Sequence, residues 1–106
     1  MASSRIDSFR SMIQSDPTNA LARYGLANEL VKAEQYGEAV AALHEYLEMN
    51  DDEGAAYRLL GFANEKLGRF AQARDAYHRG IDAAGRHHHP GMASEYEMKL
   101  QDIEDL

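Results

Sequence analysis

The sequence repeats itself at an interval of 34 residues, and this periodicity restricts the fold more than any other feature of the chain. Six pairs of size-compatible residues are separated by this interval: Leu26 and Leu60, Ala27 and Gly61, Tyr36 and Phe70, Ala39 and Ala73, Leu43 and Tyr77, and Leu47 and Ile81. A constant interval of this length is typical of solenoids, in which one small unit of secondary structure stacks on the next. We therefore expect an array of similar units.

The sequence of each repeat predicts two helices. In the first repeat, Asn19 can cap a helix that ends near Ala33, residues 34–36 form a turn, and residues 50–52 end a second helix. The apolar residues recur at the spacing of one helical face. They are Leu21, Tyr24, Leu26, Ala27, Leu30 and Val31 in the first helix, and Ala39, Val40, Ala42, Leu43, Tyr46, Leu47 and Met49 in the second.

The second repeat follows the same plan. Its apolar residues are Tyr57, Leu60, Gly61, Ala63 and Leu67, then Phe70, Ala73, Ala76, Tyr77, Ile81 and Ala84. Gly68 and Gly85 stand where the two helices are expected to end with a residue in the left-handed conformation, which glycine adopts readily.

Both flanks of the repeats also read as amphipathic helices. The N-terminal stripe is Ile6, Phe9, Met12 and Ile13, and the C-terminal stripe is Met92, Tyr96, Lys99, Leu100 and Ile103. Pro90 suits the first turn of the last helix. We predict an all-α fold, an antiparallel helix-hairpin solenoid of about six helices in a single domain spanning 1–106. Its predicted parts are an N-terminal half-repeat helix at 4–15, repeats at 20–53 and 54–87, and a C-terminal capping helix at 90–106.

Small residues recur at four apolar positions of the repeats. Ala27 and Gly61 stand on the first helices, and Ala39 and Ala73 stand on the second. A larger side chain would force neighbouring helices apart, so we expect the closest helix approaches at these positions.

Charge and composition exclude several classes of function. The formal net charge is −7, which disfavours nucleic acid and anionic membrane surfaces as partners. The absence of cysteine excludes disulfides and thiolate chemistry. No apolar segment is long enough to span a bilayer, and the N-terminus lacks the apolar core of a signal peptide. We expect a cytoplasmic protein.

Residues 20–53 and 54–87 resemble two tetratricopeptide repeats, helical hairpins that commonly bind proteins or peptides. The second matches the pattern of that family with Tyr57, Leu60, Gly61, Gly68, Phe70, Ala73, Tyr77 and Gly80. The first matches it with Leu26, Ala27, Leu30, Tyr36, Ala39 and Leu43, and Asp16–Pro17 resembles the end of a preceding unit. The sequence departs from the pattern at Arg23, Tyr46, Asp51, Asn64 and Gly85.

The resemblance implies a protein-interaction module that binds a peptide or partner protein in a concave groove, as an adapter or assembly factor. The first helix of each pair lines that groove in the family. The implied residues are Leu21, Tyr24, Asn28, Val31 and Lys32 in the first repeat, and Ala55, Arg58, Leu59, Phe62, Glu65 and Lys66 in the second. The alternative is a structural self-association unit, for instance a homodimer, in which the ends of a short array are buried against another copy.

One chaperone-binding subtype of the family is largely excluded by its residues. Such members hold a C-terminal carboxylate with a lysine and an asparagine on one helix and a lysine and an arginine on the next. Asn28 matches the asparagine, but Tyr24, Ala55 and Leu59 replace the three cations.

Histidines and carboxylates offer no recognisable catalytic or metal site. Adjacent histidines in the run His87–His89 cannot all face one ion without backbone distortion, so we interpret the run as a solvated turn. His44 and His78 occupy equivalent places and are expected to be exposed. The carboxylates are explained by outward helix faces and helix starts, with residues 51–53 favouring the start of a helix. We therefore expect no enzyme activity, no metal and no cofactor.

Overall fold

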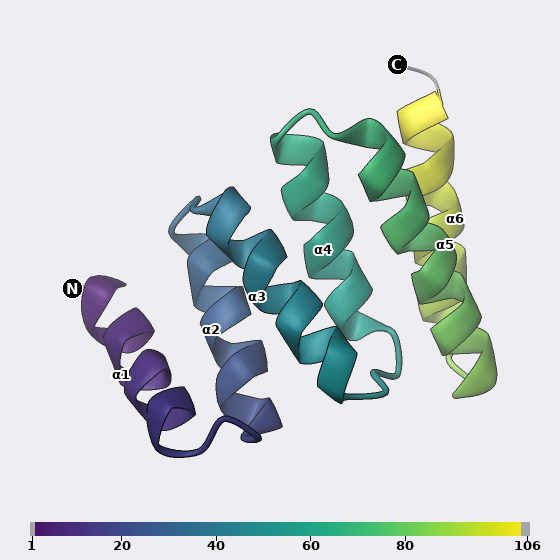
Figure 1. Cartoon of the computed structure of the whole chain (residues 1–106). Helices are drawn as coiled ribbons and strands as arrows, with labels where there is room; N and C mark the ends of the chain where they lie inside the picture. Colours follow the sequence, from purple (N-terminus) through teal and green to yellow (C-terminus); the bar gives the residue numbers. More distant parts are fainter. Residues whose placement is uncertain (1, 105–106) are drawn as a thin grey trace. The chain divides into compact units, whose positions relative to one another are not determined.

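The computed structural model of the protein describes residues 2–104, with side chains from Arg5 to Glu104. Within these residues the chain forms six α-helices joined by short turns and contains no strand (Figure 1). The helices are α1 (Ala2–Ser15), α2 (Ala20–Lys32), α3 (Tyr36–Met49), α4 (Ala55–Lys66), α5 (Phe70–Arg86) and α6 (Pro90–Glu104). The predicted all-α helical-repeat fold is thus confirmed. The predicted limits of the repeats stay a prediction, and residues 1, 105 and 106 of the expected domain lie outside the described part.

The chain divides into two compact units, of which the first ends at Asp51 and the second begins at Asp52. In the first unit, α2 packs against both α1 and α3. In the second unit, α5 packs against both α4 and α6. Each unit therefore contains one helical hairpin and one flanking helix.

One cluster in the core of the first unit draws a buried residue from each of the three helices. Ile6 of α1, Leu30 of α2 and Ala39 of α3 lie together, and Leu26 and Ala42 pack around them. A close contact joins α1 to α2, because a Cβ atom added at Gly25 would lie only 2.6 Å from the ring of Phe9.

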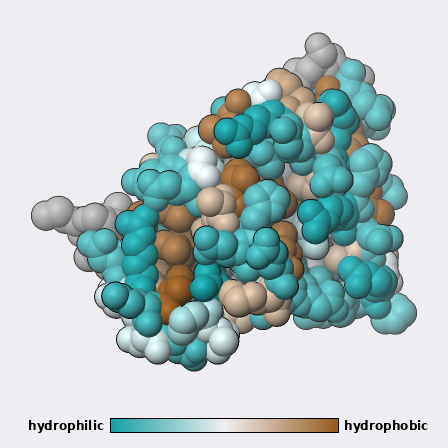
Figure 2. Space-filling view, in the orientation of Figure 1, coloured by the Kyte–Doolittle hydropathy of each residue, from teal (hydrophilic) through white to brown (hydrophobic). Residues whose placement is uncertain are grey.

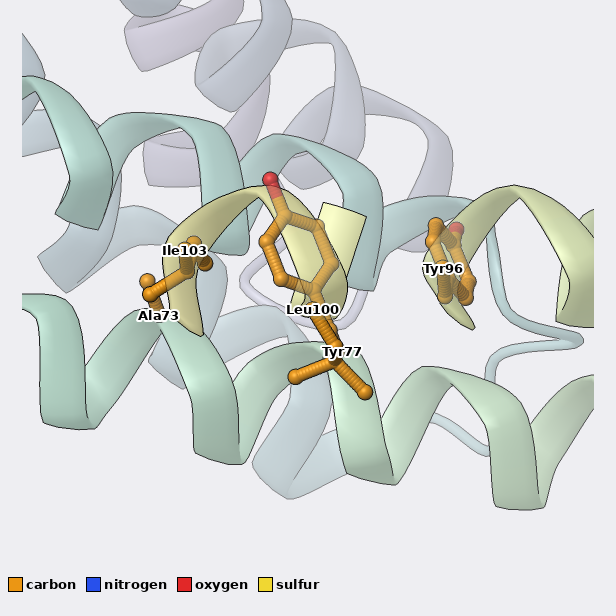
Figure 3. Close-up of a cluster of buried hydrophobic side chains, with 5 residues drawn as sticks. All are labelled: Ala73, Tyr77, Tyr96, Leu100 and Ile103. Carbon is orange, nitrogen blue, oxygen red and sulfur yellow. The ribbon is translucent and has the colours of Figure 1, made fainter. Parts of the chain in front are cut away.

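The core of the second unit is built around two tyrosines (Figure 3). Tyr77 of α5 and Tyr96 of α6 are fully buried, with ring centroids 5.7 Å apart. Ala73, Leu100 and Ile103 complete the cluster. Glycines let the rings reach the backbone, since a Cβ atom at Gly61 would overlap Tyr77 and one at Gly80 would overlap Tyr96.

The four small residues predicted to mark close helix approaches are all buried. Ala27, Ala39 and Ala73 have no exposed surface. Gly61 is buried, and the ring of Tyr77 occupies the space that a larger residue would need.

The two buried tyrosines link the stability of the second unit to pH. Burial raises the pKa of Tyr96 to about 12. Burial and the hydrogen bond to Glu65 also raise the pKa of Tyr77. The pKa of a tyrosine in the unfolded chain is about 10, which is below the folded value. The contribution of the neutral Tyr96 hydroxyl to the free energy of unfolding is therefore complete below pH 10 and is lost as the pH rises through 12. We expect the midpoint of urea unfolding to decrease when the pH is raised from 10 to 12, and to decrease less in the variant Tyr96→Phe. An equal decrease in the native chain and in Tyr96→Phe would contradict this link.

Three helices end with the same backbone turn. A left-handed residue follows the last helical carbonyls at Glu34 (φ 61°), Gly68 (φ 73°) and His88 (φ 61°). The prediction for Gly68 is confirmed, but the prediction for Gly85 is wrong. Gly85 lies inside α5, which continues to Arg86, and the amides of His88 and His89 bond back to the carbonyls of Gly85 and Ala84. The prediction failed because His88 adopts the left-handed conformation that a glycine usually adopts at the end of a helix.

Glycine should be better than the native residue at two of these turns. We expect Glu34→Gly and His88→Gly each to stabilise the protein by about 0.5–1 kcal/mol, because a side chain with positive φ is strained. Gly68→Ala should destabilise it by about 1 kcal/mol for the same reason. Urea denaturation followed by circular dichroism measures all three, and a loss of stability in both glycine variants would refute the account.

The start of α4 is held by a buried carboxylate. Asp52 Oδ2 accepts hydrogen bonds from the amides of Gly54 at 2.7 Å and Ala56 at 2.9 Å. The chain turns at Gly54 with φ 135°, and a Cβ atom there would overlap the sulfur of Met92. Tyr96 donates a hydrogen bond of 2.5 Å to the Gly54 carbonyl, which ties α6 to this turn.

Removal of this carboxylate should be costly. We expect Asp52→Ala to lower the free energy of unfolding by about 1–2 kcal/mol, because two amides lose their acceptor at the helix start. The neighbouring exposed carboxylate supplies a control, Asp51→Ala, for which we expect a smaller effect. Equal urea midpoints for the two variants would count against a capping role for Asp52.

Candidate functional site

The residues implied to bind a partner come from two helices in different units. Those of the first repeat all lie on α2, and those of the second repeat all lie on α4. We call them the α2 face (Leu21, Tyr24, Asn28, Val31 and Lys32) and the α4 face (Ala55, Arg58, Leu59, Phe62, Glu65 and Lys66). Each set lies on a single helix within its own unit.

The α2 face combines an exposed apolar side chain with half-buried groups. Leu21 at the start of the helix is 82% exposed. Tyr24 and Asn28 follow at spacings of three and four residues, which places them on the same side of the helix, and both are half-buried. The Tyr24 ring lies edge-on to Tyr46 of α3, with 5.6 Å between ring centroids. This contact fixes the orientation of the phenol.

At the other end of the α2 face, Val31 packs against the core while Lys32 is exposed. The Lys32 ammonium lies 3.7 Å from Glu29, which also pairs with Arg5 of α1 at 3.0 Å. Ion pairs at this level of exposure stabilise little, so Lys32 can change partners readily.

The α4 face is dominated by an ion pair to α6. Arg58 donates to Glu95 through Nε at 2.6 Å and through Nη2 at 2.9 Å, a two-pronged arrangement that matches a carboxylate. The Arg58 guanidinium also lies 5.9 Å from the centre of the Tyr96 ring. The hydrogen bond from Arg58 is the main reason that the pKa of Glu95 lies below its usual value.

The remaining residues of the α4 face divide between the surface and the core. Lys66 is exposed, and its ammonium lies 5.4 Å from the centre of the half-buried Phe62 ring, a favourable cation–π geometry. Glu65 accepts a hydrogen bond from the buried Tyr77 hydroxyl and so serves the packing of α4 on α5. Ala55 and Leu59 are half-buried.

Sequence reasoning missed the part that α6 plays here. Glu95 looked like one of many surface carboxylates, and Tyr96 like an ordinary core residue. The C-terminal helix occupies the place of the next unit's first helix in the sequence, but this placement alone did not identify a partner for Arg58. No periodic signal identifies which carboxylate that is.

The histidines are placed largely as expected. His44 and His78 are exposed on α3 and α5. Glu53 Oε1 lies 3.2 Å from His89 Nε2 and 3.9 Å from His87 Nδ1, so the turn before α6 contacts the segment before α4. Within residues 5–104, no three His, Asp or Glu side chains are grouped as metal ligands.

Several large apolar side chains are exposed. In the space-filling view, hydrophilic residues cover most of the visible surface and hydrophobic residues emerge in several separate places (Figure 2). The most exposed large ones are Leu21 and Met98. None of the described helices is both long and apolar enough to cross a bilayer. Recognition by these faces would combine apolar contacts with polar ones.

Two helical hairpins, each with a flanking helix, define a helical-repeat protein. The family model of the tetratricopeptide repeat matches residues 6–59. The TPR repeat-containing protein PA0015 of Pseudomonas aeruginosa is 30% identical over 82 residues, which cover 77% of this chain and 78% of that protein. The chain therefore belongs to the tetratricopeptide repeat family, as its sequence indicated.

A solved structure supports the fold. The solution structure of protein BPP2914 from Bordetella parapertussis superposes with a TM-score of 0.81 at 23% identity, covering 94% of this chain and 87% of that one. Tetratricopeptide repeats generally mediate protein–protein interaction, and this is the class of function that family membership supplies.

Proposed function

We propose that the protein is an adapter or assembly factor that binds a peptide or partner protein through the α2 and α4 faces. The observation that carries the proposal is the exposure of Leu21, which is 82% exposed at the start of a face that continues with Tyr24 and Asn28. Hydrophobic side chains beside aromatic and charged groups are the usual anchors of protein interfaces.

The proposal includes a non-enzymatic role, because members of this family are typically interaction modules. The proposed compartment is the cytoplasm, with which a chain lacking cysteine is compatible. The net charge of −7 supports a protein partner over nucleic acid.

Affinity capture from a lysate of the source cells tests the proposal. One bait is the native chain, and a second carries Leu21→Asp and Phe62→Ala, one change on each face. The control carries His44→Ala and His78→Ala, exposed residues on the second helices α3 and α5. Circular dichroism verifies that all three baits are equally helical. We expect the face variant to lose the captured protein and the control to keep it.

The alternative of self-association is resolved by light scattering of the same baits. The interaction module is supported if only the face variant loses the captured protein and the native chain is monomeric at all concentrations. Capture that is identical for all three baits would contradict the assigned faces.

A further inference from the structure

We infer that Met92 is a modification site, at which oxidation of the thioether by a peroxide weakens the packing of α6 against the start of α4. This inference is independent of the proposed function. The chain has five methionines and no cysteine, so an oxidant that reacts with sulfur attacks thioethers alone. Met12, Met49 and Met98 are exposed, whereas Met92 is half-buried. Met92 is therefore the methionine whose oxidation changes an internal contact.

The sulfur of Met92 lies at the turn that begins α4. A Cβ atom added at Gly54 would lie 2.5 Å from this sulfur, and 3.6 Å from both the Ala84 nitrogen and the Gly80 oxygen of α5. The sulfur therefore shares a narrow space with the Gly54 Cα atom and the backbone of α5. The Met92 side chain also packs against the cluster that contains Tyr96. Through these contacts Met92 joins α6 to both α4 and α5.

The oxidation of the Met92 thioether is a two-electron step. A lone pair of the sulfur attacks one oxygen of hydrogen peroxide, and an S–O bond forms as the O–O bond breaks. The proton of the transferred hydroxyl passes to the departing hydroxide, so water is released, the sulfur is oxidised and the peroxide is reduced. A methionine sulfoxide reductase supplied with a dithiol reverses the change, because the dithiol becomes a disulfide and the sulfoxide oxygen leaves as water.

The amides around the Met92 sulfur already have acceptors. Those of Gly54 and Ala56 donate to Asp52 Oδ2. That of Ala84 lies within α5, where each amide bonds to the carbonyl four residues earlier. A polar oxygen that is buried without a hydrogen bond costs free energy, so the oxidised side chain should turn toward water. This movement withdraws Met92 from Gly54 and loosens α6 at the start of α4.

Treatment of the full chain with hydrogen peroxide tests the inference. The native chain, Met92→Leu and Met98→Leu are each compared before and after oxidation. Met98→Leu is the matched control, because Met98 lies on the same helix and is 68% exposed. Peptide mass spectrometry verifies the gain of one oxygen atom at each remaining methionine. Urea denaturation followed by circular dichroism gives the folding equilibrium constant, and hydrogen exchange shows which helices loosen.

We expect oxidation to lower the folding equilibrium constant of the native chain and of Met98→Leu at least about fivefold. The constant of Met92→Leu should change less than about twofold, since changes at exposed side chains cost little. Reduction of the oxidised native chain by methionine sulfoxide reductases should restore it.

Hydrogen exchange of the oxidised native chain should be faster at the amides of Gly54 and Ala56 and in α6, and unchanged in α1, α2 and α3. Equal losses of stability in the native chain and in Met92→Leu would overturn the inference. So would unchanged exchange in a chain fully oxidised at Met92, or a Met92 that stays reduced while the exposed methionines are fully oxidised.

Discussion

Replacement of Tyr96 by alanine should destabilise the second unit by about 3–5 kcal/mol, the usual loss for a fully buried aromatic side chain. Tyr96 has no exposed surface. Its ring packs against Tyr77 and fills the space over Gly80, and its hydroxyl bonds the Gly54 carbonyl at the start of α4.

Tyr96→Phe separates the two contributions of this residue. It keeps the ring and removes the hydroxyl, so we expect a loss of about 1–2 kcal/mol. Part of the loss should be offset, because the Gly54 carbonyl also accepts from the Tyr57 amide at 3.2 Å. Urea denaturation of both variants gives the two values. A loss below 1 kcal/mol for Tyr96→Ala would mean that α6 contributes little to the second unit.

The second large effect is expected at Gly61, where a methyl group should destabilise the protein by about 1–3 kcal/mol despite the higher helix propensity of alanine. A Cβ atom there would overlap the Tyr77 ring, which is itself fully buried. The matched control is Gly85→Ala inside α5, where a Cβ atom meets nothing within 4 Å. That control should stabilise the protein by up to about 1 kcal/mol.

The first repeat suggests how to rescue this variant. Ala27 and Leu43 occupy the places of Gly61 and Tyr77, and both are fully buried. The double variant Gly61→Ala/Tyr77→Leu reproduces that pair, so its loss of stability should be smaller than the sum of the two single losses by at least about 1 kcal/mol. If the loss in the double variant equals the sum of the two single losses, the Tyr77 ring is not what makes a larger side chain at position 61 destabilising.

The helical hairpins were predictable from sequence because they depend on local physics repeated at a fixed interval. An apolar stripe with spacings of three and four defines a helix without any knowledge of its neighbours, and small residues such as Ala27 and Gly61 lie at buried positions of that stripe. The Asn19 cap was predicted in the same way, and its side chain accepts the Ala22 amide at 3.0 Å. Each of these signals lies within one or two turns of chain.

Features that depend on distant pairs were not predictable. The sequence placed Arg58 on an outward face but did not reveal that Glu95, 37 residues later, binds it. The sequence predicted that Gly85 is the left-handed residue at the end of α5, because glycine is the commonest residue in that position. In the structure His88 has the positive φ, and the backbone hydrogen bonds of the turn run from His88 and His89 back to α5. Phe70 was counted with the apolar stripe of its helix, yet it is partly exposed as the first residue of α5.

The central claim, that the faces of the first helices receive the partner, is tested most directly by hydroxyl-radical footprinting of the chain with and without the protein that it captures. The account predicts that oxidation of Leu21, Tyr24 and Phe62 falls on binding, while the exposed Met49 at the end of α3 stays reactive. Protection confined to α3 and α5, with Leu21 and Phe62 unchanged, would contradict it.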